Sequence, residues 1–204
     1  MKLLLTISLF ILTNIVFADI WPEPKTQRYF SNNKYFFIEV IPRKIPEKYF
    51  NYIDAKHKHK NLKKFKQIDT ILTPCTATLY EIKNADTIAI WSRQLINIIA
   101  PSYVTVSNDG KFIATFDNWG SMGYGLDVFV VYNNIGDLLK RYKLDDITPF
   151  PLNSYQLSIS SIWWRGDVTI SEASTGIEIC FIDKDKNKKC RNYDLTKLKF
   201  EDEH

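Results

Sequence analysis

Short apolar runs separated by polar turns fill most of the chain after residue 26, and within many of them apolar and polar positions alternate. Alternation with a period of two is the pattern of a half-buried β-strand, whereas a helix repeats every ~3.6 residues. Three stretches follow the order strand, polar turn, strand: residues 77–95, 127–144 and 176–195. Their turns begin at Lys83, Asn133 and Asp183, which are 50 residues apart twice over. Asn, Asp, Gly and Lys build these turns, as in hairpin connections.

A second pattern recurs before the hairpins. Residues 29–40 parallel residues 105–116, because each has a strand end, a Ser-Asn turn and a strand rich in aromatic and β-branched residues. In the third unit we expect the corresponding strands at 156–163 and 167–171, with Arg165-Gly166 as the turn. Each unit then holds four short strands, so we predict an all-β fold of three blade-like four-stranded antiparallel units of about 50 residues, in an open or partial propeller-like array.

One repeat domain is expected over residues 19–204. Its units extend over about 27–97, 101–148 and 153–198, and the first carries a basic insertion at 43–66. Only that insertion, roughly at 47–65, has a composition that permits a helix.

The middle unit resembles a known family of repeats. Residues 107–114 read Ser-Asn-Asp-Gly-Lys-Phe-Ile-Ala and are followed by Asp-Val-Phe-Val-Val-Tyr at 127–132 and a Gly-Asp hairpin. This is similar to a blade of bacterial TolB-type or tryptophan-aspartate-type β-propellers, in which a Ser-x-Asp-Gly-Lys turn opens a strand. The match is best over 103–144. Asn33 and Lys34 replace Asp-Gly in the first unit, and we find no such turn in the third.

The resemblance implies four-stranded blades and a role in binding or scaffolding. Closed propellers have at least about four blades, and this chain supplies three. We therefore expect an open arc, a pairing of chains or a distorted sandwich in place of a ring.

The first residues read as a cleavable signal peptide. Lys2 gives a positive start, residues 3–17 are mostly apolar, and Ala18 ends a Val-Phe-Ala sequence that suits signal peptidase. The apolar stretch is shorter than the ~20 residues that a spanning helix needs. We expect cleavage before Asp19 and a periplasmic or secreted mature chain.

Net charge does not identify a partner, but its distribution is uneven. Removing Lys2 leaves 26 basic and 23 acidic residues, and nine of the basic ones lie in 43–66. This run predicts non-specific attraction to an anionic surface, with no sequence-specific nucleic-acid binding. The lysines that would carry it are Lys56, Lys58, Lys60, Lys63 and Lys64. Their repulsion disfavours a dication at His57 and His59, so we predict no metal site there.

Three cysteines allow at most one intramolecular disulfide. A hairpin with its tip at 183–187 sets Cys180 opposite Cys190 and favours that pair, while free thiols and a bridge from Cys75 are the alternatives. The tip has oxygen ligands at alternating positions like a calcium loop. It lacks the glycine and the closing glutamate of such a loop, so we interpret it as a hairpin turn.

Two aromatic segments are candidate ligand sites. Residues 117–125 concentrate three of the seven glycines with Asp117, Asn118, Trp119 and Tyr124. Such a loop can present amides and aromatic faces to a ligand, or it can be a bent connection whose Trp covers the core. Trp163, Trp164 and Arg165 form the second segment. Adjacent strand residues face opposite sides, so one Trp is expected to be exposed, for a sugar or a partner, or at a contact between units.

No catalytic motif is present: the chain has no Gly-x-Ser-x-Gly, no His-Glu-x-x-His and no phosphate loop. Asp109 and Asp117 stand at opposite ends of one expected strand, and Asp145 and Asp146 are expected in a solvated turn. We predict an exported, non-catalytic binding protein for a protein or glycan of the cell envelope, without a cofactor. The alternative is an exported carbohydrate-active hydrolase with its site near Asp117 and Trp119.

Overall fold

The computed structural model describes residues 21–44, 73–84 and 86–201. The predicted signal peptide, Lys56, Lys58, Lys60, Lys63 and Lys64 and the two histidines of the basic insertion, and the helix expected there lie outside the described residues. No helix in the described ranges is long and apolar enough to cross a membrane.

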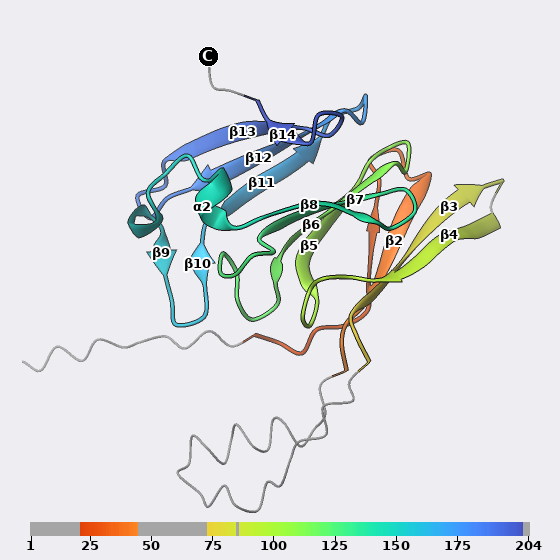
Figure 1. Cartoon of the computed structure of the whole chain (residues 1–204), viewed down its shortest axis with the longest axis horizontal. Coiled ribbons are helices and arrows are strands. Elements are labelled where there is room, and N and C mark those ends of the chain that lie inside the picture. Colours follow the sequence, from red (N-terminus) through yellow and green to blue (C-terminus); the bar gives the residue numbers. More distant parts are fainter. Residues whose placement is uncertain (1–20, 45–72, 85, 202–204) are drawn as a thin grey trace, which may run out of the picture.

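Three four-stranded antiparallel sheets form most of the described chain, as the alternation of apolar and polar residues predicted (Figure 1). Sheet 1 contains β1 (Gln27–Phe30), β2 (Phe36–Ile41), β3 (Thr76–Lys83) and β4 (Asp86–Gln94). Sheet 2 contains β5 (Pro101–Val106), β6 (Phe112–Asn118), β7 (Phe129–Asn133) and β8 (Leu138–Tyr142). Sheet 3 contains β11 (Arg165–Ile170), β12 (Gly176–Ile182), β13 (Lys188–Asp194) and β14 (Lys199–Phe200).

Within each sheet the strands run up and down in sequence order. The connections of the first to the second strand and of the third to the fourth strand are therefore at one end of each sheet, and these are all short turns. We call this end the turn pole. The opposite end, the connector pole, carries residues 21–26, 95–100, 119–128 and 143–164, which hold the long connections (Figure 1).

One serine-based turn recurs at the turn pole in all three sheets. Ser31, Ser107 and Ser171 each accept, on the side-chain oxygen, the amide of the residue five positions later, and each accepts on its carbonyl the amide three positions later. The third residue after the serine is at positive φ: 61° at Lys34, 67° at Gly110 and 60° at Ser174. The prediction that the third unit lacks this turn is wrong, because a serine takes the position where the motif has glycine.

The three serine turns contact one another. Asn33 donates its backbone amide to Asn108 Oδ1 over 3.0 Å, and Asn108 donates its own amide to Ser174 Oγ over 2.8 Å. These bonds hold the first hairpins of the three sheets side by side.

The 50-residue interval between hairpins does not mark equivalent positions. The turns at Lys83 and Asn133 join the third and fourth strands of their sheets, whereas the turn at Asp183 joins the second and third strands of sheet 3. The equivalent turn in sheet 3 begins at Asp194, whose carboxylate accepts the amides of Thr196 and Lys197. Hairpin chemistry alone does not reveal which strands it joins.

The connection from sheet 2 to sheet 3 also differs from the prediction. β9 (Gln156–Leu157) and β10 (Ile162–Trp163) pair only with each other, and Arg165-Gly166 belongs to β11 and is not a turn. A four-residue helix, α2 (Leu144–Ile147), contains Asp145 and Asp146 in its first turn, because the buried Leu144 and Ile147 draw this segment into the core. A short 3-10 helix spans Leu152–Ser154.

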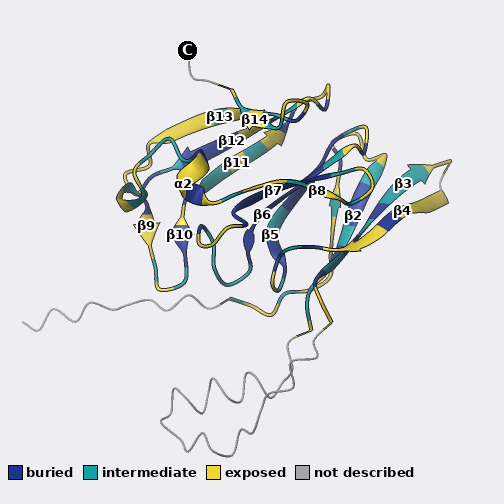
Figure 2. Cartoon of the chain, in the orientation of Figure 1, coloured by how far each residue is buried: buried dark blue, intermediate teal, exposed yellow. Residues whose placement is uncertain are grey.

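Two hydrophobic cores lie between the sheets. The first core packs Ile38, Leu79 and Trp91 of sheet 1 against Val104 and Val130 of sheet 2. The second core packs the other face of sheet 2 against sheet 3 and is built from sixteen buried residues. Sheet 2 is thus covered on both faces, and β6 and β7 are buried almost throughout (Figure 2). Among the described residues, no further sheet covers the outer faces of sheets 1 and 3, so the array is open.

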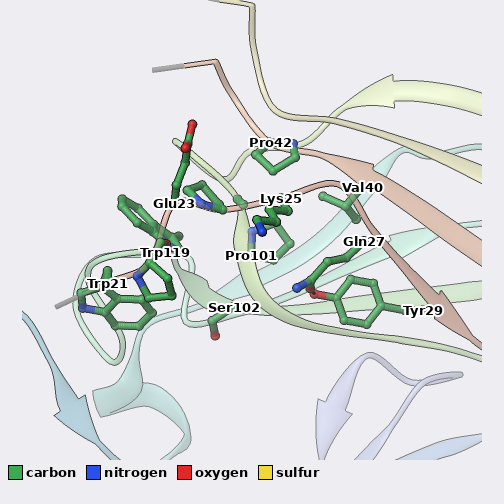
Figure 3. Close-up of a pocket in the computed structure, with 13 residues that line it drawn as sticks. Trp21, Glu23, Lys25, Gln27, Tyr29, Val40, Pro42, Pro101, Ser102 and Trp119 are labelled. Carbon is green, nitrogen blue, oxygen red and sulfur yellow. Dashed lines mark hydrogen bonds between the residues drawn. The ribbon is translucent and has the colours of Figure 1, made fainter. Parts of the chain in front are cut away.

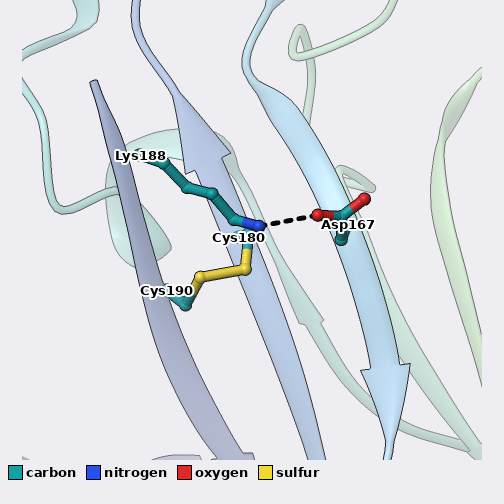
Figure 4. The surroundings of a disulfide bond; sticks show 4 residues. All are labelled: Asp167, Cys180, Lys188 and Cys190. Carbon is teal, nitrogen blue, oxygen red and sulfur yellow. Dashed lines mark hydrogen bonds and ion pairs between the residues drawn. A yellow bond between two sulfur atoms is a disulfide. The ribbon is translucent and has the colours of Figure 1, made fainter. Parts of the chain in front are cut away.

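The outer face of sheet 3 carries the disulfide. Cys180 and Cys190 are register partners on β12 and β13, and a bond joins their sulfurs. This is the pair that the hairpin favoured. Lys188 and Asp167 form an ion pair of 2.7 Å on the same face (Figure 4). Cys75 is free and buried.

Candidate functional site

A cavity of about 370 Å³ opens at the connector pole, between the N-terminal segment 21–27 and the beginning of β5 (Figure 3). Tryptophan, tyrosine and proline side chains form most of its wall, and Glu23, Lys25, Gln27 and Ser102 add polar atoms. Its volume falls within the range of ~300–1,000 Å³ that is typical of small-molecule sites. Apolar walls with a few polar groups are also typical of such sites.

Two tryptophans form one side of the cavity. The rings of Trp21 and Trp119 meet edge to face, with their centroids 6.0 Å apart. Trp119 donates its indole N–H to the carbonyl of Pro22 over 2.9 Å and its backbone amide to the carbonyl of Ala100 over 2.8 Å. Trp21 donates its indole N–H to Ser160 Oγ over 3.3 Å. Three separate segments thus fix the two rings before any ligand arrives.

Ser102 on β5 and Tyr29 on β1 contribute polar groups to the cavity. These two strands lie side by side at the centre of the array, and we call them the innermost strands. Ser102 Oγ donates to the carbonyl of Phe116 over 3.1 Å and accepts from Arg165 Nη1 over 3.1 Å. Tyr29 donates its hydroxyl to Gln27 Oε1. Burial raises the pKa of Tyr29, so at neutral pH it offers a hydroxyl and not a phenolate.

A buried ionic network lies behind Ser102. Asp117 Oδ2 accepts from Arg165 Nη1 over 2.8 Å, and its Oδ1 accepts from Trp164 Nε1 over 2.9 Å and from the amide of Gly123 over 2.8 Å. Asp117 has no exposed surface, and burial raises its pKa against the opposing effect of Arg165 and the other donors. Because β6 supplies the acid, while Arg165 begins β11 and Trp164 directly precedes it, the network ties sheet 2 to sheet 3.

Arg165 is also held by aromatic rings. Its guanidinium carbon lies 5.4 Å from the centre of the Tyr103 ring and 5.5 Å from that of Phe116. Together with Asp117 these rings fix the side chain beside the innermost strands. Arg165 therefore positions Ser102 at the cavity and does not itself line it.

The predicted ligand residues separate into three groups. Trp119 lines the cavity, while Asp117, Trp164 and Arg165 support it from behind. The second group also includes Asn118, which is buried and accepts the amide of Ile98 over 3.1 Å.

Tyr124 and Trp163 form the third group, which is exposed outside the cavity. Trp163 is 44% exposed and Trp164 0%, so the two adjacent tryptophans face opposite sides as predicted.

Asp117 does not suit the hydrolase alternative. A catalytic carboxylate must reach its substrate, and both oxygens of Asp117 are engaged by buried donors. Asp109 lies in the serine turn at the opposite pole, where it accepts a hydrogen bond from Ser107. The two acids therefore do not share a site.

The described residues also contain one cluster of metal-ligand types. Atoms of Glu178, Cys180 and Cys190 lie within 4.8 Å of one another. The two sulfurs are bonded to each other and so lack the thiolate form that binds metals. The histidine pair and the lysines from Lys56 to Lys64 lie outside the described residues.

Sequence reasoning missed Trp21, Tyr29 and Ser102. Trp21 had a usable signal, because it opens a Trp-Pro-Glu-Pro sequence just after the expected cleavage site. Nothing in the sequence signals the other two, since their position depends on β1 and β5 lying side by side at the centre of the array.

Comparison with known proteins gives little beyond this architecture. No family model matches the chain, and no curated protein matches it in sequence. The periplasmic gluconolactonase PpgL of Pseudomonas aeruginosa is a similar solved structure, with a TM-score of 0.43 and 12% identity. The match covers 86% of this chain and 42% of that one, so the chain spans less than half of PpgL. Because this similarity is low, the assignment of the fold rests on the strand pairing described above.

Proposed function

We propose that this chain is an exported, non-catalytic binding protein whose ligand site is the cavity that Trp21 and Trp119 line on one side. The observation that carries the proposal is the fixed pair of indoles, which three hydrogen bonds hold at the mouth of a cavity of about 370 Å³. Pre-organised aromatic surface raises affinity, because little conformational entropy is lost on binding.

A saccharide of one or two rings is the ligand class that suits this cavity best. Sugar rings present C–H faces to aromatic side chains and hydroxyls to neighbouring polar groups. Trp21 and Trp119 supply the aromatic surface, while Gln27, Ser102 and Lys25 supply donors and acceptors. Glu23 adds a carboxylate acceptor at the rim (Figure 3). The concave form favours such a ligand over a protein surface.

The disulfide supports the exported location, because disulfides persist mainly in oxidising compartments. Attraction of the basic insertion to an anionic envelope surface remains a further part of the proposal. We also infer that the sheets are blades of the TolB-type or tryptophan-aspartate-type kind. The recurrence of the serine turn at Ser31, Ser107 and Ser171 supports this relationship.

A glycan array of monosaccharides and short oligosaccharides, probed with the purified mature chain, tests the function. A positive sugar is then titrated calorimetrically against Trp119→Ala, Trp119→Phe and Trp163→Ala. We expect Trp119→Ala to weaken binding at least tenfold, about 1.4 kcal/mol, and Trp119→Phe to recover part of the affinity. Trp163→Ala is the matched control, because that indole is exposed outside the cavity. Absence of any array signal, or equal losses at Trp119 and Trp163, would contradict the proposal.

A further inference from the structure

In the part of the chain that the structure describes, no other sheet covers the outer faces of sheets 1 and 3, and these two faces differ in chemistry. On sheet 3, no large apolar side chain of β11 to β14 is exposed, and charged residues such as Asp167, Glu178 and Lys188 occupy the outer face. The outer face of sheet 3 is therefore polar and suited to contact with water. The outer face of sheet 1 is different.

Cross-strand register defines the outer face of sheet 1. One row pairs Phe30 with Phe37 and Phe37 with Tyr80, and another pairs Ile41 with Thr76. Phe30 is 52% exposed and Ile41 46% exposed, whereas Phe37, the central ring, is 5% exposed. The ring centroid of Phe37 lies 5.1 Å from that of Phe30 and 4.7 Å from that of Tyr80, so the aromatic side chains form a continuous ladder across three strands.

Charge on this face is balanced within a single pair. A third row pairs Arg28 with Glu39 and Glu39 with Thr78, and Arg28 Nε lies 2.6 Å from Glu39 Oε2. The arginine also lies over the Phe37 ring, 5.4 Å from its centre. The face therefore holds an aromatic ladder beside one cation and one anion.

We propose that the outer face of sheet 1 binds the same face of a second copy of this chain. Face-to-face packing is already how sheet 1 meets sheet 2 and sheet 2 meets sheet 3, and the second copy continues that arrangement. A two-fold axis brings identical patches together, so the patch must complement itself. Arg28 and Glu39 meet this requirement, because the axis sets Arg28 of each copy near Glu39 of the other.

The size of the face predicts a weak dimer. Four strands ~4.8 Å apart and about seven residues long at ~3.3 Å per residue give a footprint of about 450 Å² per copy. The total of about 900 Å² is at the low end of protein interfaces, among transient complexes. We therefore expect assembly to depend on concentration in the micromolar range. The proposal is independent of the cavity, which lies at the connector pole.

Sedimentation velocity on the mature chain tests this interface. Protein concentrations from about 1 to about 100 µM cover the dissociation constants expected for a weak complex. We expect a shift from monomer to dimer, and we expect Ile41→Asp to abolish it. Ile135→Asp is the matched control, because Ile135 is an isoleucine 52% exposed at the β7–β8 turn, and this variant should dimerise normally. A wild-type monomer throughout, assembly beyond a dimer, or a dimer that survives Ile41→Asp would overturn the proposal.

Charge exchange gives a second test with its own control. Arg28→Glu and Glu39→Arg each break the pair inside one chain, and each alone places like charges across the two-fold axis. When the two variants are mixed, every pair across the axis is opposite in charge. We expect each variant alone to be monomeric and the mixture to form a heterodimer that a tag on one chain can capture. Failure of the mixture to associate more strongly than either variant would contradict the Arg28–Glu39 contact.

Discussion

Replacement of Asp117 should destabilise the fold more than replacement of any other acidic residue that the structure describes. Its carboxylate is fully buried and accepts from Arg165, Trp164 and Gly123. Removing one partner of a buried ion pair is destabilising by about 3–5 kcal/mol, because the remaining charge is left unpaired. Asp117 also has a φ of 53°, a conformation that disfavours alanine by about 1–2 kcal/mol.

Two substitutions separate these contributions. Asp117→Asn keeps the shape and tolerates the positive φ, so it tests the charge, and we expect a loss of about 2–3 kcal/mol in the free energy of unfolding. Asp117→Ala removes all three contacts and adds the backbone penalty, so we expect about 4–6 kcal/mol. Urea unfolding, followed by tryptophan fluorescence to which the buried Trp164 contributes, measures both losses in free energy. We expect the slope of the free energy of unfolding with urea concentration to stay unchanged.

Asp127→Asn is the matched control. Asp127 pairs with Arg141 over 2.7 Å, and its own side chain is 11% exposed, but the arginine is 38% exposed, so solvent screens the pair and we expect this substitution to be less destabilising than Asp117→Asn. The reasoning is refuted if Asp117→Asn is no more destabilising than Asp127→Asn. In that case, the buried network would not be what joins sheet 2 to sheet 3.

Three further predictions concern the cysteines and one glycine loop. Cys180 and Cys190 are 10 residues apart, so dithiothreitol should lower the free energy of unfolding by about 2–3 kcal/mol and leave a double Cys→Ser variant of that pair unaffected. Burial raises the pKa of Cys75 to about 12, so at pH 8 the residue is almost entirely the unreactive thiol. Iodoacetamide should label it only after unfolding, as read by mass spectrometry, and rapid labelling of the native chain would show the site to be open. Gly123→Ala should destabilise the chain more than Gly125→Ala in urea unfolding. Both have positive φ, but a Cβ at 123 meets the β9–β10 hairpin at 2.7 Å and one at 125 meets nothing within 4 Å.

The strand content was readable from the sequence because the cores lie between sheets. In sheets 1 and 3 alternation turns one face of a strand toward a core, whereas β6 and β7 of sheet 2 are apolar runs buried on both faces. Trp163 and Trp164 show the alternation at two adjacent positions, one exposed and one fully buried. The assignment of strands to sheets was less readable. Asn133 and Asp183 make the same local hydrogen bonds, because turn chemistry responds to the local backbone and not to the position of the hairpin in its sheet.

The third serine turn was missed for a related reason. A search for Asp-Gly after the serine depends on glycine at the positive-φ position, yet Ser174 takes that conformation at 60° and its hydroxyl accepts the amide of Asn108. A contact between sheets thus offsets the backbone penalty. No local sequence signal can report such a compensation.

The candidate site was half predictable. Trp119 was named because glycines surround it, and it does line the cavity. Asp117 and Arg165 were expected to meet a ligand, but they meet each other, because burial of one charge requires a partner of the opposite sign. Its neighbour on the same wall is Trp21, nearly a hundred residues earlier in the chain, and only the folded array brings it to Trp119.

The most direct test of the ligand site is a titration of ¹⁵N-labelled mature chain with the sugar identified on the array, followed through the tryptophan indole N–H signals. The indoles of Trp21 and Trp119 are held at the cavity, while Trp163 is exposed outside it and Trp164 is buried behind it. We predict that the Trp21 and Trp119 signals shift together along one binding curve while the Trp163 signal stays in place. A shift confined to Trp163, or no shift of either cavity indole, would contradict the account.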